Sequence, residues 1–352
     1  MLNTSFEPDY KNLVLAARNI EAPRMPLYEH LVNTDFMEAM LGCKFEPLGR
    51  SEDPADLREF FRHYCDFFRT FGYDTVSYEY CLGTAMPDTG RLGGHGLPPG
   101  ITTRADLERY PWDEAEEIFY RVSAPRFRAL REALPPGMKA VGGVGNGVFE
   151  LAQELVGFEP LCYMLADDED LFRDLTNKIG SLMLAAWKRL LCEFGDIFCV
   201  CRCGDDLGYK SATMLSHDTL RRYIFPHYKR IIAEIHAHGK PFLLHSCGNI
   251  MGVMEDIIAA GIDAKHSNED IILPFPAWVE QYGSRIGNFG GIDTDNLCRM
   301  DENQLREEIR DIVNKCAGHG GIAFGTGNSI PSYVPPENFL AMNTAVRKLR
   351  RE

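Results

Sequence analysis

A chain of 352 residues with 45% apolar and 25% charged residues has the composition of a globular protein with a large core. Its formal net charge of −14 argues against binding to nucleic acid or anionic lipid, because both partners reward clustered lysine and arginine. The eleven cysteines are scattered, MLNTSFEPDY shows no signal-like segment, and no uninterrupted apolar run reaches about 18 residues. These features predict a reduced, cytoplasmic protein without a disulfide framework.

Short apolar segments alternate with helical patterns along the whole chain. Most of them end in polar or Gly-rich residues, and helix-length connections between strands favour a parallel sheet. Their number matches an α/β barrel, and no GxGxxG fingerprint favours a doubly wound sheet. The sequence therefore predicts one α/β domain over residues 1–352, folded as a single (β/α)8 TIM barrel. The eight candidate strands begin at Pro26, Asp74, Met138, Asp196, Pro241, Ile262, Arg285 and Gly321.

The clearest helical pattern begins at the capping residue Ser216 and stops at Gly239. Pro226 lies inside this pattern and should kink or divide the helix, because proline lacks the N–H donor and clashes with the preceding turn. The last helix opens with Pro335 and Pro336, which the first turn of a helix tolerates.

One segment does not fit the short connections of a barrel. Residues 82–106 read LGTAMPDTGRLGGHGLPPGITTRAD and show no periodicity. Loops of this length in compact domains are usually functional or disordered. Because the segment follows the second strand, it should emerge on the catalytic face of a barrel. We interpret it as a Gly/Pro-rich lid or, alternatively, as a disordered loop.

Polar side chains gather at the ends of the candidate strands. In a barrel these ends converge on one face, so together they define a candidate site. Any single member could instead be a structural hydrogen-bonding residue. The set comprises Tyr28, Glu29, His30, Glu79, Asn146, Asp205, Asp206, His245, Cys247, Asn249, His266, Asp293 and Asn328.

The sharpest pattern is the H-x-C pair in PFLLHSCGNI. Residues two apart on an extended chain point the same way, so His245 and Cys247 can reach one ion. Nitrogen together with thiolate suits zinc, whose catalytic sites take three protein ligands and leave one position open. The alternative is a hydrogen-bonded histidine beside a buried free cysteine.

The segment CVCRCGDD places Cys199, Cys201 and Cys203 on one strand face, where small apolar cysteines can line a barrel wall. Asp205 and Asp206 follow the strand and could ligate a metal, orient a histidine or hold a substrate, or merely form a turn. His266 and Asp293 could likewise orient a ligand or be satisfied structural residues.

Four longer stretches read GDDLG with TMLSHDTLRRYIFPHYKRI, LLHSCGNI, GGIDTDNL and GTGNSIPSYVPPENFLAM. They resemble the uroporphyrinogen decarboxylase superfamily, in its branch of cobalamin-linked methyltransferases, and the resemblance covers nearly the whole chain. It implies an α/β barrel, in agreement with the strand count.

The chain departs from the decarboxylases of this superfamily at their arginine-rich segment. Where they carry RQAGRY, this chain has YEHLVN, so Glu29 and His30 replace cations that meet substrate carboxylates. Their FSDIL aspartate is matched only loosely by the YEYCLG region, and Asn328 fills their C-terminal histidine position. The resemblance therefore disfavours decarboxylation of uroporphyrinogen.

Zinc methyltransferases of the superfamily use H-x-C and a third cysteine in a GCGIP-like turn. His245 and Cys247 match the first part, but GNSIP places Asn328 where the cysteine should be. An amide oxygen is a poor zinc ligand, so a third ligand would come from elsewhere. By strand position the candidates are Glu29, Glu79 and Asp206.

The resemblance implies a methyltransferase that moves a methyl group between a small substrate and a cobalamin carrier protein, assisted by zinc on His245 and Cys247. Alternatives are a metal-free decarboxylase or lyase acting on a smaller carboxylate, and a non-catalytic barrel that binds a tetrapyrrole or corrinoid. The resemblance is also compatible with a homodimer. We assign catalytic roles to Glu29, His30, Asp206 and His266, and substrate contacts to Tyr28, Glu79, Asn146, Asp205, Asn249, Asp293 and Asn328.

Overall fold

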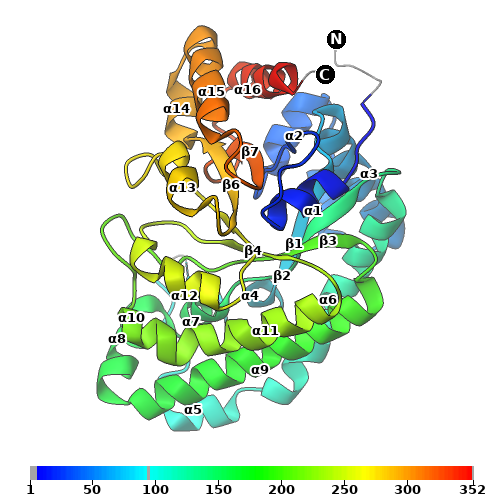
Figure 1. Cartoon of the computed structure of the whole chain (residues 1–352). Helices are drawn as coiled ribbons and strands as arrows, with labels where there is room; N and C mark the ends of the chain where they lie inside the picture. The colour runs from blue at the N-terminus through cyan, green and yellow to red at the C-terminus, as the bar shows by residue number, and fades with distance from the viewer. Residues whose placement is uncertain (1–5, 93–95, 351–352) are drawn as a thin grey trace.

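A computed structural model describes residues 6–92 and 96–350 of the chain. Its centre is one parallel sheet whose strands neighbour one another in sequence order and curl around a common interior (Figure 1). The described residues contain seven strands, and each of them lies in one of the eight candidate segments. They are β1 (Thr75–Cys81), β2 (Lys139–Gly145), β3 (Phe198–Gly204), β4 (Phe242–His245), β5 (Ala264–His266), β6 (Gly287–Ile292) and β7 (Ile322–Thr326).

The predicted strand beginning at Pro26 is not a strand of this sheet, and eight strands are not found among the described residues. The segment lies between β7 and β1, but it pairs only through single bridges from Leu27 to Phe324 and from Val32 to Ile330. The reason is local. A ladder would direct the N–H of Thr326 to the next backbone carbonyl, whereas the Glu29 carboxylate accepts that N–H at 3.3 Å.

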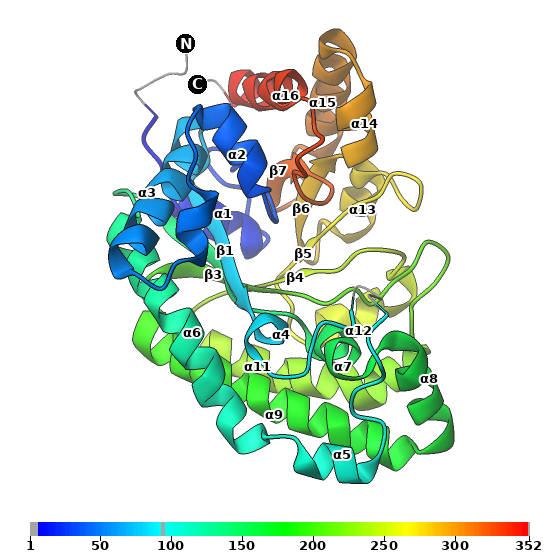
Figure 2. The same cartoon turned by 180° about the vertical axis from the view of Figure 1, so that it is seen from behind.

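Helices cover the outer face of the sheet, and Figures 1 and 2 show α6, α9 and α11 packed along one side with α15 and α16 on the other. The main apolar core lies between these helices and the strands. The helices of nine or more residues are α3 (Pro54–Thr70), α6 (Trp112–Ala133), α7 (Val148–Val156), α8 (Phe158–Asp167), α9 (Glu169–Phe194), α11 (Phe225–Ala237), α15 (Glu302–Cys316) and α16 (Pro336–Leu349). The shorter ones are α1 (Lys11–Ala17), α2 (Thr34–Leu41), η1 (Glu46–Arg50), α4 (Leu82–Ala85), α5 (Arg104–Arg109), α10 (His217–Thr219), η2 (Leu220–Ile224), η3 (Met251–Val253), α12 (Met254–Ala259), α13 (Phe275–Tyr282) and α14 (Thr294–Arg299).

A smaller apolar cluster fills the inside of the curled sheet and closes one end of it. Leu13 and Ala16 of α1 belong to this cluster together with Leu243 of β4. A side chain on Gly287, the first residue of β6, would meet the Ala16 carbonyl oxygen at 2.4 Å, so α1 lies against the amino ends of the strands. The interior can therefore open only toward the carboxyl ends, where the polar strand endings lie.

The predicted helix boundaries are confirmed in this part of the chain. The Ser216 hydroxyl accepts the N–H of Thr219, and a π-helical turn, η2, ends directly before the α11 segment that contains Pro226. The missing proline N–H explains why the regular α pattern is interrupted there. The last helix begins at Pro336, as expected.

The segment from 82 to 106 is not the structureless loop that its composition suggested. It contains α4 and the start of α5, and its intervening backbone is tied to the end of α7. Gly90 N–H donates to Glu154 at 2.6 Å, and Ile101 N–H donates to the Leu155 carbonyl at 3.1 Å. Residues 93–95 of the proposed lid lie outside the described residues, and the lid stays a prediction.

All eleven cysteines are free thiols, which confirms that no disulfide framework holds the fold. Within residues 6–92 and 96–350, no helix combines the length and the apolar character needed to span a bilayer.

Candidate functional site

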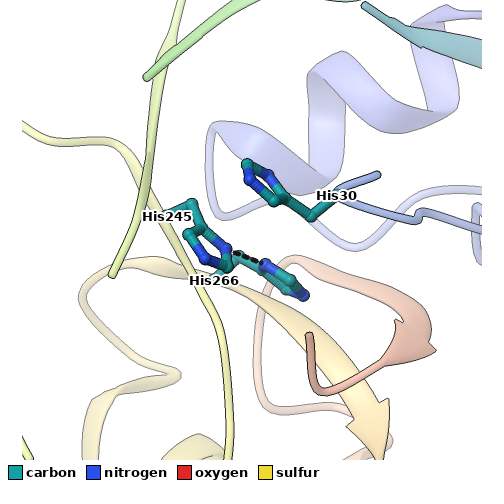
Figure 3. A group of neighbouring side chains, drawn as sticks. All are labelled: His30, His245 and His266. Carbon is teal, nitrogen blue, oxygen red and sulfur yellow. Dashed lines mark hydrogen bonds between the residues drawn. The ribbon is translucent and has the colours of Figure 1, made fainter. Parts of the chain in front are cut away.

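Polar side chains from several strands meet at the carboxyl end of the sheet, opposite α1. His245 ends β4 and His266 ends β5, and the two are register partners. Cys247 follows β4, Asp206 follows β3, and His30 comes from the extended segment before α2. Figure 3 shows His30, His245 and His266 converging from these separate parts of the chain.

Two glycines allow the loops after β3 and β4 to touch. Gly248 has φ 77°, and a side chain there would lie 2.3 Å from the carbonyl carbon of Gly208. This close approach lets the Asp206 carboxylate accept the backbone N–H of Cys247 at 2.8 Å. The acid that follows one strand is thereby fixed beside the thiol that follows the next.

The three histidines are buried and in ring contact. The rings of His30 and His245 stack with centroids 3.7 Å apart, and Nδ1 of His245 lies 2.7 Å from Nδ1 of His266. Burial lowers the pKa of His266 to about 3, and burial also lowers the pKa values of His30 and His245 well below their usual range. All three imidazoles are therefore neutral near pH 7.

This histidine trio is not a suitable metal cage. The stacked rings of His30 and His245 are parallel within 7°, so their in-plane lone pairs do not converge on one point. The 2.7 Å separation between His245 and His266 is a hydrogen-bond distance. Two nitrogen ligands of one tetrahedral zinc would lie roughly 3.3 Å apart.

His245, Cys247 and Asp206 fit one zinc ion better. The Cys247 sulfur lies 3.4 Å from Nε2 of His245, and Oδ1 of Asp206 lies 3.9 Å from the same nitrogen. Bond lengths of about 2.1 Å to nitrogen or oxygen and about 2.3 Å to sulfur place tetrahedral zinc ligands roughly 3.3–3.7 Å apart. Of the three candidate third ligands, only Asp206 lies in a metal-capable group with His245 and Cys247. Its side chain is 46% exposed, which leaves the group open to solvent and substrate.

The Cys247 sulfur also receives hydrogen bonds from neutral groups. The Asn328 amide nitrogen lies 3.2 Å from the sulfur, and the Ser267 hydroxyl lies 3.8 Å from it. Burial, followed by the nearby Asp206 charge, raises the pKa of Cys247 to about 12. The sulfur therefore keeps its proton at neutral pH unless a cation replaces that proton.

Asn328, predicted to contact substrate in place of a third cysteine, turns its amide nitrogen to Cys247. The Ser329 hydroxyl donates to the Asn328 oxygen at 3.3 Å, which agrees with this orientation of the amide. Asn328 is thus a hydrogen-bond donor to a candidate metal ligand.

Over residues 87–349 the chain matches the family described as uroporphyrinogen decarboxylase (URO-D). The chain belongs to this family. A methyltransferase from Methanosarcina mazei has a similar structure, with a TM-score of 0.74 and 18% sequence identity over 97% of this chain and 99% of that chain. This likeness shows a shared fold. Among curated protein sequences, none matches the chain.

Other solved structures are similar at a lower level. A B12-independent methionine synthase from Shewanella sp. W3-18-1, in complex with selenomethionine, gives a TM-score of 0.45 at 11% identity over 65% of this chain and 67% of that chain. Native xylanase 10B from Thermotoga maritima gives a TM-score of 0.46 at 9% identity over 96% of this chain and 98% of that chain.

Asp205, the immediate neighbour of Asp206, is placed very differently in this URO-D family chain. Its carboxylate is completely buried and accepts the N–H groups of Phe149 and Glu150, at 3.2 and 2.8 Å, and the Tyr228 hydroxyl at 2.8 Å. Asp205 therefore anchors the start of α7 to β3. Its predicted contact with substrate stays untested, but none of its surface is exposed.

Glu29, predicted to be catalytic, directly precedes His30 and bonds to Thr326 and Tyr73. Its carboxylate accepts the Thr326 hydroxyl at 2.6 Å and the Tyr73 hydroxyl at 3.3 Å, and it is completely buried. Burial raises the pKa of Glu29 to about 8, although the donors from Thr326 and Tyr73 oppose this shift. These bonds tie Glu29 to β7, and its predicted catalytic role stays a prediction.

Tyr28 and Glu79 join a buried network around Arg202, which the sequence analysis had assigned to no role. Arg202 donates to Glu79 at 2.9 Å, to the Tyr28 hydroxyl at 3.0 Å and to the His30 carbonyl at 2.7 Å. Burial raises the pKa of Tyr28 to about 12. A signal was available, because an arginine inside a buried strand needs a paired charge.

Glu150 is a second residue near the site that sequence reasoning missed. It accepts the Asp206 N–H at 3.1 Å and the Asn146 side-chain amide at 3.2 Å. Burial, followed by the charges of Asp205 and Asp206, raises the pKa of Glu150 to about 8. The sequence carried no signal, because a glutamate in an amphipathic helix is ordinary.

Three other predicted substrate contacts have structural partners. Asn249 accepts the N–H of Met251 at 3.2 Å, before η3. Asp293 accepts the N–H of Asp295 at 2.8 Å and caps α14. Asn146, with φ 63°, accepts the N–H of Gly83 at 3.0 Å and holds α4.

Proposed function

We propose that this URO-D family protein is a methyltransferase that moves a methyl group between a small substrate and a cobalamin carrier protein, with zinc as cofactor. The observation that carries the proposal is the convergence of His245 Nε2, the Cys247 sulfur and an Asp206 oxygen within ligand-to-ligand distance. This nitrogen, sulfur and carboxylate set leaves the fourth zinc position for a substrate atom.

Zinc held by His245, Cys247 and Asp206 would supply Lewis acidity, stabilising a substrate thiolate or polarising the leaving oxygen or nitrogen of a methyl donor. Around it, the chain's own residues position the ligands. Asn328 and Ser267 donate to the Cys247 sulfur, and His30 stacks on His245 and restricts its ring. The smaller apolar cluster, which includes Leu243 and residues of α1, keeps water out of the end of the interior that α1 closes.

The charges around the site favour a neutral or cationic substrate. Arg202 and Lys265 are buried, Arg202 pairs with Glu79, and Lys265 donates to the Ser267 carbonyl. The partly exposed charges beside the sulfur are carboxylates, Asp206 above all. A methylated amine, ether or thiol meets less repulsion there than a carboxylate or phosphate would.

Exposed apolar side chains on the rim support a protein partner. Leu31, Tyr209, Ile271 and Tyr333 are 42%, 63%, 79% and 73% exposed. Tyr209, Ile271 and Tyr333 follow the carboxyl ends of β3, β5 and β7, and Leu31 lies in the extended segment before α2. Large exposed apolar groups beside a site are typical of docking surfaces. A carrier protein that presents cobalamin to the open end of the sheet would cover them.

The deciding experiment measures metal in anaerobically purified full-length protein, wild type beside Cys247→Ser, with Cys192→Ser as a matched control at an exposed free cysteine. We expect near-stoichiometric zinc in wild type and Cys192→Ser and a large loss in Cys247→Ser. Wild-type protein that takes up no zinc even when zinc is supplied would refute the zinc mechanism.

An activity assay then separates the reactions. Wild-type protein, reduced cobalamin and a methylated thiol, ether or amine should yield methylcobalamin, followed by its absorption spectrum, and Cys247→Ser should lose this activity. Metal-independent release of carbon dioxide from a small carboxylate would instead favour a lyase. Tetrapyrrole binding without any turnover would favour a non-catalytic barrel.

A further inference from the structure

The second nitrogen of His245 is held by a chain of buried groups that runs away from Cys247. His245 Nδ1 lies 2.7 Å from Nδ1 of His266, and His266 Nε2 lies 3.1 Å from the Thr326 carbonyl oxygen. Each atom in this chain has a restricted role as donor or acceptor, so the positions of the protons can be deduced.

The Thr326 carbonyl can only accept, so Nε2 of His266 carries a proton. The reverse arrangement would set a nitrogen lone pair against the carbonyl oxygen at 3.1 Å. One proton must also lie between the two Nδ1 atoms, since two lone pairs at 2.7 Å would repel. If His266 supplied that proton as well, it would be a completely buried cation near the buried positive charges of Arg202 and Lys265.

We infer that His266 is a positioning residue that fixes His245 with its proton on Nδ1 and a bare Nε2 aimed at Cys247 and Asp206. The inference rests on the proposed function only for its consequence for zinc. A neutral imidazole can ligate a metal through one nitrogen when the other carries the proton and donates it to a fixed partner.

The support for His266 reaches further, to Glu29 and β7. Thr326 pairs with Ile292 of β6, and its N–H and hydroxyl both donate to the Glu29 carboxylate. These bonds fix the direction of the Thr326 carbonyl that accepts from His266. Tyr28 packs edge-on against the His266 ring, with centroids 5.3 Å apart, and limits its rotation. Glu29 and Tyr28 thereby help to hold the His266 ring in place.

The test uses full-length protein with ¹⁵N-labelled histidine, first without metal. Two-bond proton–nitrogen spectra report which ring nitrogen carries the proton, and variants lacking one histidine assign the signals. We expect His245 to carry its proton on Nδ1 in the wild type. In His266→Leu the acceptor is gone, and His245 should shift toward the Nε2-protonated form. In His266→Asn the amide oxygen can occupy the place of Nδ1 and should retain the wild-type form.

Zinc affinity, measured by competition with a chromophoric chelator, gives the second readout. Loss of an outer hydrogen-bond partner typically weakens metal binding about 10–100-fold, and we expect this for His266→Leu but only a small change for His266→Asn. A wild-type His245 protonated on Nε2 would overturn the inference. An unchanged His245 tautomer and zinc affinity in His266→Leu would also overturn it. So would a loss of zinc affinity in His266→Asn as large as that in His266→Leu.

The outcomes separate this inference from the proposed function. Wild-type protein that shows the expected His245 tautomer but binds no zinc would refute the zinc methyltransferase and leave the role of His266 intact. If His266→Leu does not fold, the metal-free wild-type spectrum and His266→Asn still decide the question.

Discussion

The β1–β3 side of the site and its β4–β5 side are both rich in polar groups, but those groups are used differently. On the β1–β3 side, Arg202, Glu79 and Asp205 are buried and bonded to protein partners. On the β4–β5 side, the Cys247 sulfur and Nε2 of His245 lie at ligand distance from each other and next to a half-exposed carboxylate.

The difference shows how neighbouring residues can serve either to stabilise the fold or to bind a ligand. Asp205 and Asp206 are consecutive, yet Asp205 turns inward to the start of α7 and Asp206 turns to the N–H of Cys247. A buried polar atom whose partners are all protein atoms stabilises the fold. An atom that keeps an open side can bind a ligand, so the two sides should respond differently to substitution.

The largest effect should follow from breaking the buried ion pair on the β1–β3 side. Arg202→Met leaves the Glu79 charge buried without its partner, which should destabilise the protein by about 3–5 kcal/mol in urea unfolding. The double variant Arg202→Met with Glu79→Leu should recover most of that loss. Equal stability of the single variant and the wild type would contradict a structural role for this pair.

The next effect is a pH dependence of stability that comes from Glu150 in α7. The pKa of Glu150 is raised to about 8 in the folded protein, from a usual value near 4.5. The folded state therefore holds the proton more tightly, and this contribution is complete below about pH 4.5 and lost as the pH rises toward 8. Through this group the wild type should lose on the order of 3 kcal/mol of stability between pH 5 and pH 8. Glu150→Gln should not show that loss.

Thermal unfolding of wild type and Glu150→Gln at a series of pH values checks this expectation. Gln153, on the same helix and also buried, offers Gln153→Leu as a control that changes α7 without removing a titrating group. Parallel stability curves for wild type and Glu150→Gln would show that Glu150 does not titrate as stated.

The two adjacent aspartates after β3 give the sharpest contrast between a buried structural acid and a candidate ligand. Asp205→Ala leaves two backbone N–H groups and the Tyr228 hydroxyl without their acceptor and should cost about 2–3 kcal/mol of stability. Asp206→Ala should cost only about 1 kcal/mol of stability, because the half-exposed side chain loses one hydrogen bond from Cys247, but it should weaken zinc binding by more than about 100-fold, beyond the loss of an outer partner. The reverse pattern would exchange the roles that we assign to the two residues.

The smallest expected effect is a gain of zinc affinity from a substitution after β7, next to the Cys247 sulfur. The Asn328 amide nitrogen lies 3.2 Å from the Cys247 sulfur, so Asn328→Cys places a second thiol beside the zinc ligands. We expect zinc affinity to rise about tenfold, since thiolate is a better zinc ligand than an amide. Asn328→Ser, which adds no thiolate, is the matched control in the same chelator competition.

Much of the fold was accessible from the sequence because short apolar strands and capped helices alternate regularly. Seven candidate strands and the interruption before Pro226 were predicted and are found. The strand predicted from Pro26 was wrong, because the Glu29 side chain accepts the Thr326 N–H that would continue the backbone pairing. The predicted loop at residues 82–106 was partly wrong, because α4 and α5 form there.

The site was accessible only in part. His245 and Cys247 were found because side chains two apart on an extended chain share a direction. Arg202 and Glu150 were missed because their main partners, Glu79 for Arg202 and Asp206 for Glu150, lie far from them in sequence.

The sequence by itself determined that an imidazole and a thiol emerge together at the carboxyl end of β4, because strand periodicity is a local property. Only the tertiary structure decided their partners. Gly204 pairs with His245, and the contact of Gly208 with Gly248 brings Asp206 to Cys247. Pairing of β4 with β5 sets His266 against the other nitrogen of His245. Such contacts depend on strand register and loop approach, which join residues that are distant in the chain.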